Sequence, residues 1–519
     1  MRIGFANIYS FRPHVHHLVY LSKILGDAGH ETFFLTCDGS VDNCYVRSLK
    51  KTSKFIECSK CILGGIRSFP VSNITSLSHK VDINTSLDCI EEIALSSSCT
   101  LHRTESEEEW SDECVVETRK SFYNSIQKTY NVTLSWIENN KLDAVICFNG
   151  RMELTQSIIK ACEIMNIPFI THERTWFGDG LHMIPNNNCL SIKSLNKMVE
   201  KFDNKPLTSK QAQYAGKLIG QRFLQQNVLE WRLYNKDSVS ISWPLGAAKK
   251  KVLVLPSSKN EFAGHKEWLT QWKDNTSALD DFFTAFQIEL DQVVVRFHPN
   301  WSENIGKIQG DRSRLHYQEW AQKRGIYFFD SDTKVNTYDL IQEADIIILN
   351  GGSSAVEAGA LGKQVICLGH STYEKAGFVR TFLTKEDMYV KKMHNNLDKM
   401  TIIKSTLRYV YLRAKRFPQF VDYVKAKTTT EYEFFKGAHT DKIIKMFQTK
   451  DIEPDDSIYA DDDEGENGIV ELLLEKEWHT LVAFKESIDK KYKERLHVQR
   501  RVGLNFIDSI RKLTPRGDR

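Results

Sequence analysis

The sequence predicts an α/β protein with two parallel sheets. Short apolar runs recur along the 519 residues, and segments with apolar side chains at helical spacing lie between them. This alternation is typical of βαβ units, in which helices cover the faces of a parallel sheet. It occurs before residue 172 and again after residue 250, and a chain of this length exceeds what one hydrophobic core usually serves. We therefore expect two modules with a cleft between them.

The first module begins with an apolar strand and an amphipathic helix. Residues 14–28 carry apolar side chains in steps of three and four, and Gly29 ends this helix. Residues 37–117 are rich in Ser, Thr and acidic residues, and their periodicity is too weak to assign elements. We place the first domain at 1–245, with an irregular insertion at about 37–117. The expected strands are 2–7, 32–36, 143–148 and 167–171, and the expected helices are 14–28, 118–139 and 153–166.

The second module, placed at 246–450, opens after the Trp243-Pro244 break and has the clearer pattern. The expected strands are 251–255, 293–297, 326–329, 345–350 and 364–369, with helices around 336–343 and up to about 361. The polar segments PSSK, HPN, NGGSS and GHSTY follow four of these strands. Ligands of open parallel sheets bind at the carboxyl ends of the strands, so we expect these segments to converge at one edge.

The C-terminal part is expected to be a helical extension. An acidic linker at 451–468 precedes a helical, basic tail at 469–519. From Lys490 onward the tail has ten basic and three acidic residues, and it has apolar residues at helical spacing. Such a helix docks on an anionic membrane surface, or it packs on the C-terminal module or on a second copy. The apolar positions are Val498, Val502, Phe506, Ile510 and Leu513.

Composition narrows the class of protein. The 70 basic and 67 acidic residues give a net charge of +3, which indicates no nucleic-acid partner. No run approaches the roughly 18 apolar residues of a membrane span, and the N-terminus lacks the features of a signal peptide. We therefore expect a cytoplasmic protein whose eleven cysteines are reduced thiols. Four of them have the spacing C-x6-C-x13-C-x2-C, which makes them a weak zinc candidate or unrelated thiols: Cys37, Cys44, Cys58 and Cys61.

Several residues of the second module are candidates for binding a phosphate. The glycines of Asn350-Gly351-Gly352-Ser353-Ser354 let a backbone approach closely, and free amides at a helix start attract anions. The alternative is an ordinary Ser-capped helix. His298 follows a strand and can donate a hydrogen bond or a positive charge to a phosphate. The remaining candidates at this edge are Arg296, two residues earlier, and Ser257 and Ser258 of the PSSK segment.

The first module offers a candidate catalytic pair. The segments NGR (149–151) and THER (171–174) also follow strands, so Arg151 and Glu173 should face the cleft from the opposite side. A carboxylate there can deprotonate a hydroxyl group or act as a nucleophile. The alternative is an Arg–Glu salt bridge that holds the two loops together.

These segments resemble those of the capsule polysaccharide biosynthesis glycosyltransferases, the group that includes bacterial β-Kdo transferases. The similarity is densest over 251–378, with LPSSKNEFAGH, RFHPN, NTYDLIQEADIIILNGGSSAVEAGALGKQVICLG and YEKAGF, and a second stretch is CFNGR followed by HERTWFGDG. The resemblance implies a GT-B architecture, with two Rossmann-like domains facing a cleft. His298 and Ser353–Ser354 look like the pairs with which CMP-sugar transferases hold the CMP phosphate. It thus implies a CMP-activated 2-keto acid sugar, such as Kdo or a sialic-type acid, as the donor.

The resulting expectation is a transferase that moves this sugar onto a surface-polysaccharide or glycolipid acceptor and requires no metal or other cofactor. The first domain would hold the acceptor, and the second would hold the nucleotide-sugar and stabilise the departing phosphate. UDP-sugar transferases and UDP-GlcNAc 2-epimerases share the fold and have a similar Gly-rich loop with a following Glu, here Glu357. A UDP-sugar transferase or a 2-epimerase is therefore one alternative, and a non-catalytic subunit of a polysaccharide assembly is another.

Overall fold

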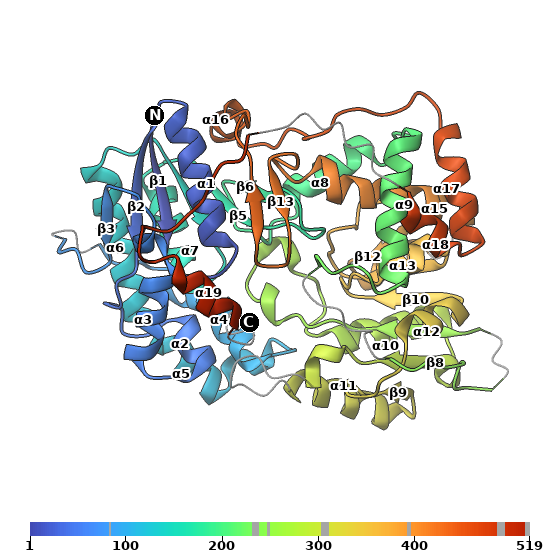
Figure 1. Cartoon of the computed structure of the whole chain (residues 1–519). Coiled ribbons are helices and arrows are strands. Elements are labelled where there is room, and N and C mark those ends of the chain that lie inside the picture. The colour runs from blue at the N-terminus through green and yellow to red at the C-terminus, as the bar shows by residue number, and fades with distance from the viewer. Residues whose placement is uncertain are drawn as a thin grey trace.

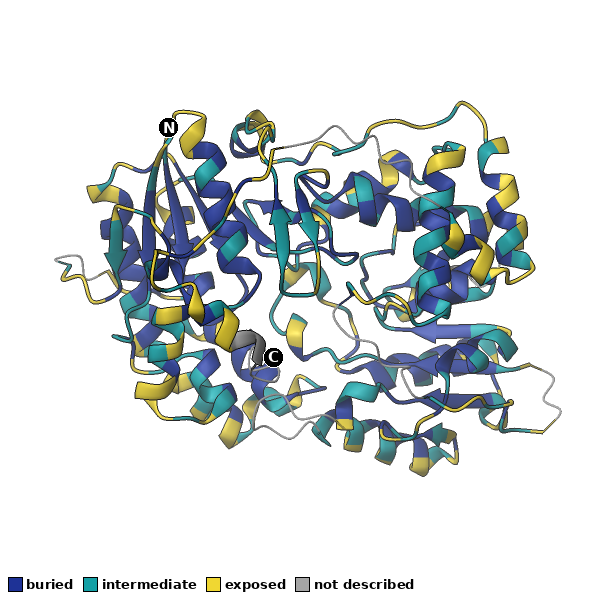
Figure 2. Ribbon diagram, viewed as in Figure 1, coloured by how far each residue is buried: buried dark blue, intermediate teal, exposed yellow. Residues whose placement is uncertain are grey.

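Two six-stranded sheets organise the chain (Figure 1). The computed structural model describes residues 1–81, 85–230, 238–246, 250–302, 311–391, 396–484 and 494–513. The central strands of both sheets are buried, and exposed residues lie mainly on the outer helices and loops (Figure 2). Among the described residues, no helix is long and apolar enough to cross a membrane.

The first sheet has the strand order β3-β2-β1-β4-β5-β6. Its strands pair in parallel except β6, which runs antiparallel to β5. The predicted parallel arrangement thus ends at β6, an edge strand that the sequence did not predict. Only six residues separate β5 from β6, which is too short for a parallel crossover, and Gly178 and Gly180 turn the chain back with positive φ angles of 102° and 79°. The strands are β1 (Arg2–Asn7), β2 (Glu31–Thr36), β3 (Ile74–Ser76), β4 (Ala144–Phe148), β5 (Phe169–Arg174) and β6 (Leu181–Pro185).

The insertion at 37–117 is folded and mostly helical. Its helix α4 (Ile90–His102) packs against α5, α6 and α7. The residues of α4 that pack there, 96–100, are Ser, Cys and Thr, and all of them are buried. Ser98 and Thr100 donate to carbonyl groups of the helix itself, Ser97 donates to Glu153, and a run of such small polar residues leaves no apolar period in the sequence. The helices of this domain are α1 (His14–Asp27), α2 (Tyr45–Lys50), α3 (Lys54–Gly64), α4, α5 (Glu113–Ser121), α6 (Tyr123–Asn139) and α7 (Glu153–Ile164).

The second sheet is entirely parallel, with the order β12-β11-β10-β7-β8-β9. Counted from its first strand, it has the same order as the first sheet, which is the 3-2-1-4-5-6 order of a Rossmann-like domain. Two Rossmann-like domains are thereby confirmed. The strands are β7 (Val252–Leu255), β8 (Val293–Arg296), β9 (Tyr327–Phe329), β10 (Ile346–Leu349), β11 (Gln364–Leu368) and β12 (Val379–Phe382); the helices are α10 (Asn275–Phe286), α11 (Asp311–Arg324), α12 (Thr337–Glu343), α13 (Ala355–Ala360) and α14 (Lys385–Lys391).

Helices from two distant parts of the chain pack together beside the second domain. Helix α9 (Ser209–Phe223), which lies before residue 245, contacts α13, α15, α17 and α18. The acidic segment 451–468 packs here too, because Glu466 is fully buried and pairs with Arg408 at 2.8 Å. Opposite charges thus hold this segment against the helices. The remaining helices are α8 (Lys193–Phe202), α15 (Lys399–Tyr411), α16 (Asp441–Thr449), α17 (Glu464–Leu474) and α18 (Trp478–Ala483).

The basic tail lies on the first domain (Figure 1). Residues 494–505 form no helix, and α19 begins only at Phe506 and ends at Leu513. The prediction of one helix from 498 to 513 is therefore wrong. Arg500 explains the extended chain, because its guanidinium donates to the carbonyl groups of Leu63 and Gly64 and lies 4.8 Å from the Phe69 ring. The chain reaches this point past a two-stranded antiparallel sheet, β13 (Val424–Ala426) and β14 (Tyr432–Phe434).

Candidate functional site

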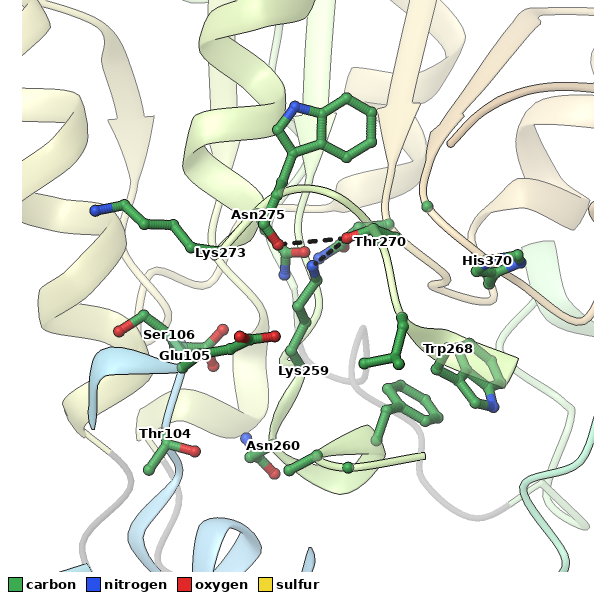
Figure 3. A pocket seen from close by; sticks show the side chains of 18 of the residues that line it. Thr104, Glu105, Ser106, Lys259, Asn260, Trp268, Thr270, Lys273, Asn275 and His370 are labelled. Atoms are coloured by element: carbon green, nitrogen blue, oxygen red, sulfur yellow. Dashed lines mark hydrogen bonds between the residues drawn. The ribbon is translucent and has the colours of Figure 1, made fainter. Parts of the chain in front are cut away.

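A cavity lies at the carboxyl edge of the second sheet, where the two domains meet (Figure 3). Its volume is about 640 Å³, counted with the open space at its mouth. The loops after β7, β10 and β11 line it with Lys259, Asn350 and His370, and residues 104–107 of the first domain close the other side. Strands β7 and β10 are the neighbours at which the strand order reverses, and this is where open α/β sheets bind their ligands.

A buried carboxyl group, Glu105, and a half-buried ammonium group, Lys259, face this cavity from opposite domains. Burial raises the pKa of Glu105 to about 7, although hydrogen bonds from Ser313 and Ser258 oppose the shift. Burial also lowers the pKa of Lys259, although the negative charges of Asp274 and Glu105 act to raise it. The Lys259 ammonium group donates to Thr270 Oγ1 at 3.2 Å. Buried groups with shifted pKa values in a concave site are typical of functional sites.

An aromatic pair forms the apolar part of the wall. The rings of Phe262 and Trp268 stack with their centroids 3.8 Å apart. Trp268 Nε1 donates to the carbonyl group of Leu190 at 2.8 Å, so this wall is attached to the first domain. A cavity with an apolar wall and a few charged groups is suited to a ligand with a flat ring and an anionic part.

Glu105 should make the stability of the protein depend on pH. A carboxyl group whose pKa is raised from 4.5 to about 7 stabilises the fold below pH 4.5, and this contribution is lost as the pH rises through 7. Between pH 5 and pH 8, wild type should therefore lose up to about 3 kcal/mol of unfolding free energy through this group. The Glu105→Gln variant lacks the titrating group, so its unfolding free energy should rise by this amount relative to that of wild type. Urea unfolding at both pH values measures this difference. A Glu319→Gln control, exposed on α11, should show no change, and an equal response of both variants would contradict the assignment.

Of the residues predicted to bind a phosphate, Asn350 lines the cavity. Its side chain also joins two loops: Oδ1 accepts from the backbone N–H of Ser257 at 2.6 Å, and Nδ2 donates to the Ser257 carbonyl group at 2.7 Å. Ser258 Oγ accepts from Trp301 Nε1 at 2.7 Å. Asn350, Ser257 and Ser258 thus set the shape of the loops beneath the cavity.

Ser353 and Glu357 are held by an arginine outside the cavity. Arg222, on α9, donates from Nη2 to Ser353 Oγ at 3.2 Å and from Nε to Glu357 Oε1 at 2.9 Å. Arg222 also pairs with Glu230, and all three charged side chains are buried. Ser354 precedes α13 without a capping hydrogen bond from its side chain, and the Gly352 carbonyl group accepts from the Tyr373 hydroxyl group at 3.1 Å. None of these residues lines the cavity, so their binding to a donor stays a prediction.

The two candidates at the end of β8 also lie outside the cavity lining. The Arg296 guanidinium donates to the carbonyl groups of Phe297, Asp330 and Thr333, and burial lowers the pKa of Arg296 to about 10. It therefore joins the ends of β8 and β9. His298 Nδ1 accepts from the backbone N–H of Asn300 at 3.2 Å.

In the first domain, Glu173 is surrounded by hydrogen-bond donors. His14 Nε2 lies 2.9 Å from Oε1, the backbone N–H of Arg174 donates to the same oxygen at 3.0 Å, and Asn149 Nδ2 donates to Oε2 at 3.1 Å. Burial alone would raise the pKa of Glu173, but His14 and these hydrogen bonds lower it to about 2. Glu173 is therefore ionised at neutral pH.

Arg151 does not pair with Glu173. Its Nη1 donates to Ser96 Oγ and Thr100 Oγ1, both at 3.0 Å, and thereby fastens the NGR loop to α4. The alternative of an Arg151–Glu173 salt bridge is therefore wrong. The serine and the threonine that hold Arg151 belong to the insertion, in which the sequence periodicity was too weak to assign helices.

The four cysteines with suggestive spacing are all free thiols: Cys37 follows β2, Cys44 precedes α2, and Cys58 and Cys61 are on α3. Burial raises the pKa of Cys37 to about 11, and the neighbouring Cys61 and Cys58 contribute to the shift. Within the described parts of the chain, three side chains of another kind, His14, His17 and His172, bring their ligand atoms within 4.8 Å of one another.

Sequence reasoning missed Glu105, Lys259 and His370 as site residues. Lys259 and His370 belong to PSSK and GHSTY, two of the segments expected at this edge, so their position offered a signal. Glu105 offered no such signal, because it lies in the insertion. Its position at the cavity depends on tertiary contacts, such as the hydrogen bond that it accepts from Ser313 Oγ, 208 residues later in the sequence.

Comparisons with known proteins give weak similarities. No protein-family model and no curated protein match the sequence. Among solved structures, the chain is similar to the KpsC β-Kdo 2,4 transferase of Thermosulfurimonas dismutans, with 14% identity, 59% of this chain and 87% of that chain covered, and a TM-score of 0.34. The KpsC β-Kdo 2,7 transferase of the same organism is 15% identical, with 66% of this chain and 89% of that chain covered and a TM-score of 0.33. The UDP-GlcNAc 2-epimerase of Methanocaldococcus jannaschii is 12% identical, with 79% of this chain and 99% of that chain covered and a TM-score of 0.28. The fold assignment rests on the strand order of the two sheets.

Proposed function

We propose that this protein is a nucleotide-sugar-dependent glycosyltransferase whose donor binds in the cavity between Glu105 and Lys259. The observation that carries the proposal is the position of this cavity at the switch point of the second sheet, closed by residues of the first domain. Lys259 and His370 would face the phosphate of the donor, and the Phe262–Trp268 pair would contact its base. Positive charge at the phosphate stabilises it as it leaves the sugar.

Glu173 would act on the sugar from the first domain. An ionised carboxylate with a pKa of about 2 is a weak base, so it is better suited to stabilising the positive charge that develops at the anomeric carbon or to attacking that carbon. The residues around Glu173 support its position near the boundary between the two domains. Burial is the main cause that raises the pKa of Cys189, and the negative charge of Glu173 is the next largest. Glu261 of the second domain contributes to the same shift.

The loop that carries Cys189 connects Glu173 with the cavity wall. Asn187 Nδ2 donates to Glu267 Oε1 at 2.9 Å, and the Leu190 carbonyl group accepts from Trp268.

A CMP-activated 2-keto acid sugar as the donor, and a surface-polysaccharide or glycolipid acceptor, remain our proposals on the basis of the sequence resemblance. Contact of the tail with the inner face of a membrane also remains a proposal, and exposed Val502, Phe506 and Ile510 support it.

Nucleotide binding tests the donor assignment. CMP should raise the melting temperature more than UDP or GDP, and at a hundred times its dissociation constant it should stabilise the protein by about 2.7 kcal/mol. Lys259→Met should abolish this shift, and Lys266→Met, an exposed lysine outside the cavity lining, should retain it. A larger shift with UDP would transfer the donor to the UDP class. Conversion of a nucleotide-sugar without any acceptor would indicate an epimerase, and no shift with any nucleotide would contradict the proposal.

A further inference from the structure

Three buried histidines converge in the first domain, away from the cavity lining. His14 and His17 are three residues apart in the first turn of α1, so they lie on one face of the helix, and His172 lies on β5. One ring nitrogen from each lies within 4.8 Å of the others. His17 and His172 have no exposed surface, and His14 is 6% exposed.

These rings carry polar atoms that nothing in the described chain satisfies. Both ring nitrogens of His17, both of His172, and Nδ1 of His14 are buried and have no hydrogen-bond partner among the residues the structure describes. A buried polar atom without a partner costs about 1–3 kcal/mol. A neutral imidazole has one nitrogen lone pair, so the three rings together offer three lone pairs to a ligand that accepts them.

The remaining nitrogen of His14 has the partner that a metal-binding histidine requires. Nε2 lies 2.9 Å from Glu173 Oε1, so an N–H there donates to the carboxylate and Nδ1 keeps its lone pair for a metal. Histidine ligands of metals almost always donate their other ring N–H to a carboxylate, carbonyl group or water, which fixes the tautomer and the ring orientation. Asn149 holds the second oxygen of Glu173 at 3.1 Å, so the carboxylate is itself oriented.

We propose that His14, His17 and His172 bind one divalent transition-metal ion, with zinc as the best fit to three imidazoles. Glu173 supplies a negative charge beside the site, and Arg174, the nearby cation, donates to the Leu229 carbonyl group. Ligand nitrogens around a zinc ion lie about 3.3 Å apart, so binding draws the three rings closer.

The proposed ion would join the start of α1 to β5 and hold His14 against Glu173. Three protein ligands leave a fourth position for water or another oxygen ligand. Aromatic rings surround the site, with Phe148 4.2 Å from the His14 ring and Tyr432 4.7 Å from the His17 ring. An apolar shell of this kind limits the access of water to a metal.

Cobalt binding to the chelator-treated full-length protein tests the site. Wild type should bind one Co²⁺ per chain with the visible absorption of a nitrogen-ligated, four-coordinate ion, and added Zn²⁺ should displace it. His17→Gln and His172→Gln should each weaken binding at least tenfold, and Glu173→Gln should weaken it 10–100-fold through His14. His16→Gln, the neighbouring histidine on the same helix, should bind as wild type does.

Absence of these bands from wild type, or unchanged binding by both histidine variants, would overturn the proposal. A thiolate-to-cobalt band that Cys58→Ser removes would assign the ion to the cysteines instead. X-ray absorption of the zinc-loaded wild type counts the imidazole ligands without any variant, so the test remains decisive even if a variant does not fold. None of these readouts requires turnover or nucleotide, so the metal site and the transferase function can fail independently.

Discussion

Glu173→Gln should reduce glycosyl transfer by about 10²–10³-fold, the usual cost of removing one group that stabilises charge in the transition state, while CMP binding remains within a few-fold of wild type. The charge of Glu173 would be required at the sugar, whereas the nucleotide would be held by the second domain. Glutamine has the same shape, and its one carbonyl oxygen can still accept from His14, whereas its amide nitrogen cannot accept from Asn149 as the second carboxylate oxygen does. Initial rates with saturating donor, together with the nucleotide-induced shift in melting temperature, measure both quantities.

Asp179→Asn is the matched control for this prediction. Asp179 lies in the loop that follows β5, the strand that carries Glu173, but its carboxylate pairs with Lys425 at 2.8 Å and accepts from the backbone N–H of Ala426 at 3.0 Å. We expect the control to stay within a few-fold of the wild-type rate. Near-normal turnover of Glu173→Gln, with a collapse in Asp179→Asn, would move the catalytic role to Asp179.

Arg222→Met should lower the unfolding free energy by about 3–5 kcal/mol, because it leaves two buried carboxylates without their cation. Arg222 contacts Glu230, Glu357 and Ser353, and it is 4% exposed. Burial raises the pKa of Glu230 despite the opposing charge of Arg222, which shows how unfavourable this carboxylate is without a partner. Urea unfolding at pH 7 measures the loss.

Two further variants separate the buried charges from the side-chain packing. Replacing Glu230 and Glu357 with Gln in the Arg222→Met background removes the unpaired charges and should recover a large part of the loss. Arg324→Met breaks a partly exposed pair with Asp280 and should cost about 1 kcal/mol or less. Equal losses in Arg222→Met and Arg324→Met would show that the buried network contributes no more than a surface pair.

The sequence by itself determined most of the parallel strands of both sheets, but it predicted neither β3 nor β12. Residues 2–7 and 346–349 are apolar runs that remain buried on both faces of a sheet, so their composition alone indicates a strand. The same pattern, with polar segments after the strands, predicted the edge at which the cavity lies. Asn350, Lys259 and His370 follow those strands directly, and their position therefore depends only on local order along the chain.

Only the tertiary structure decided which side chains meet. Glu105 faces Lys259 across the cavity because buried Ser, Cys and Thr residues pack α4 into the first domain, and small polar residues have no helical apolar period. Ser353 is held by Arg222, 131 residues earlier, and His14 meets His172 only when α1 lies against β5. Local periodicity reports burial of a segment, whereas the pairing of charges and of metal ligands depends on contacts between segments that are distant in the sequence.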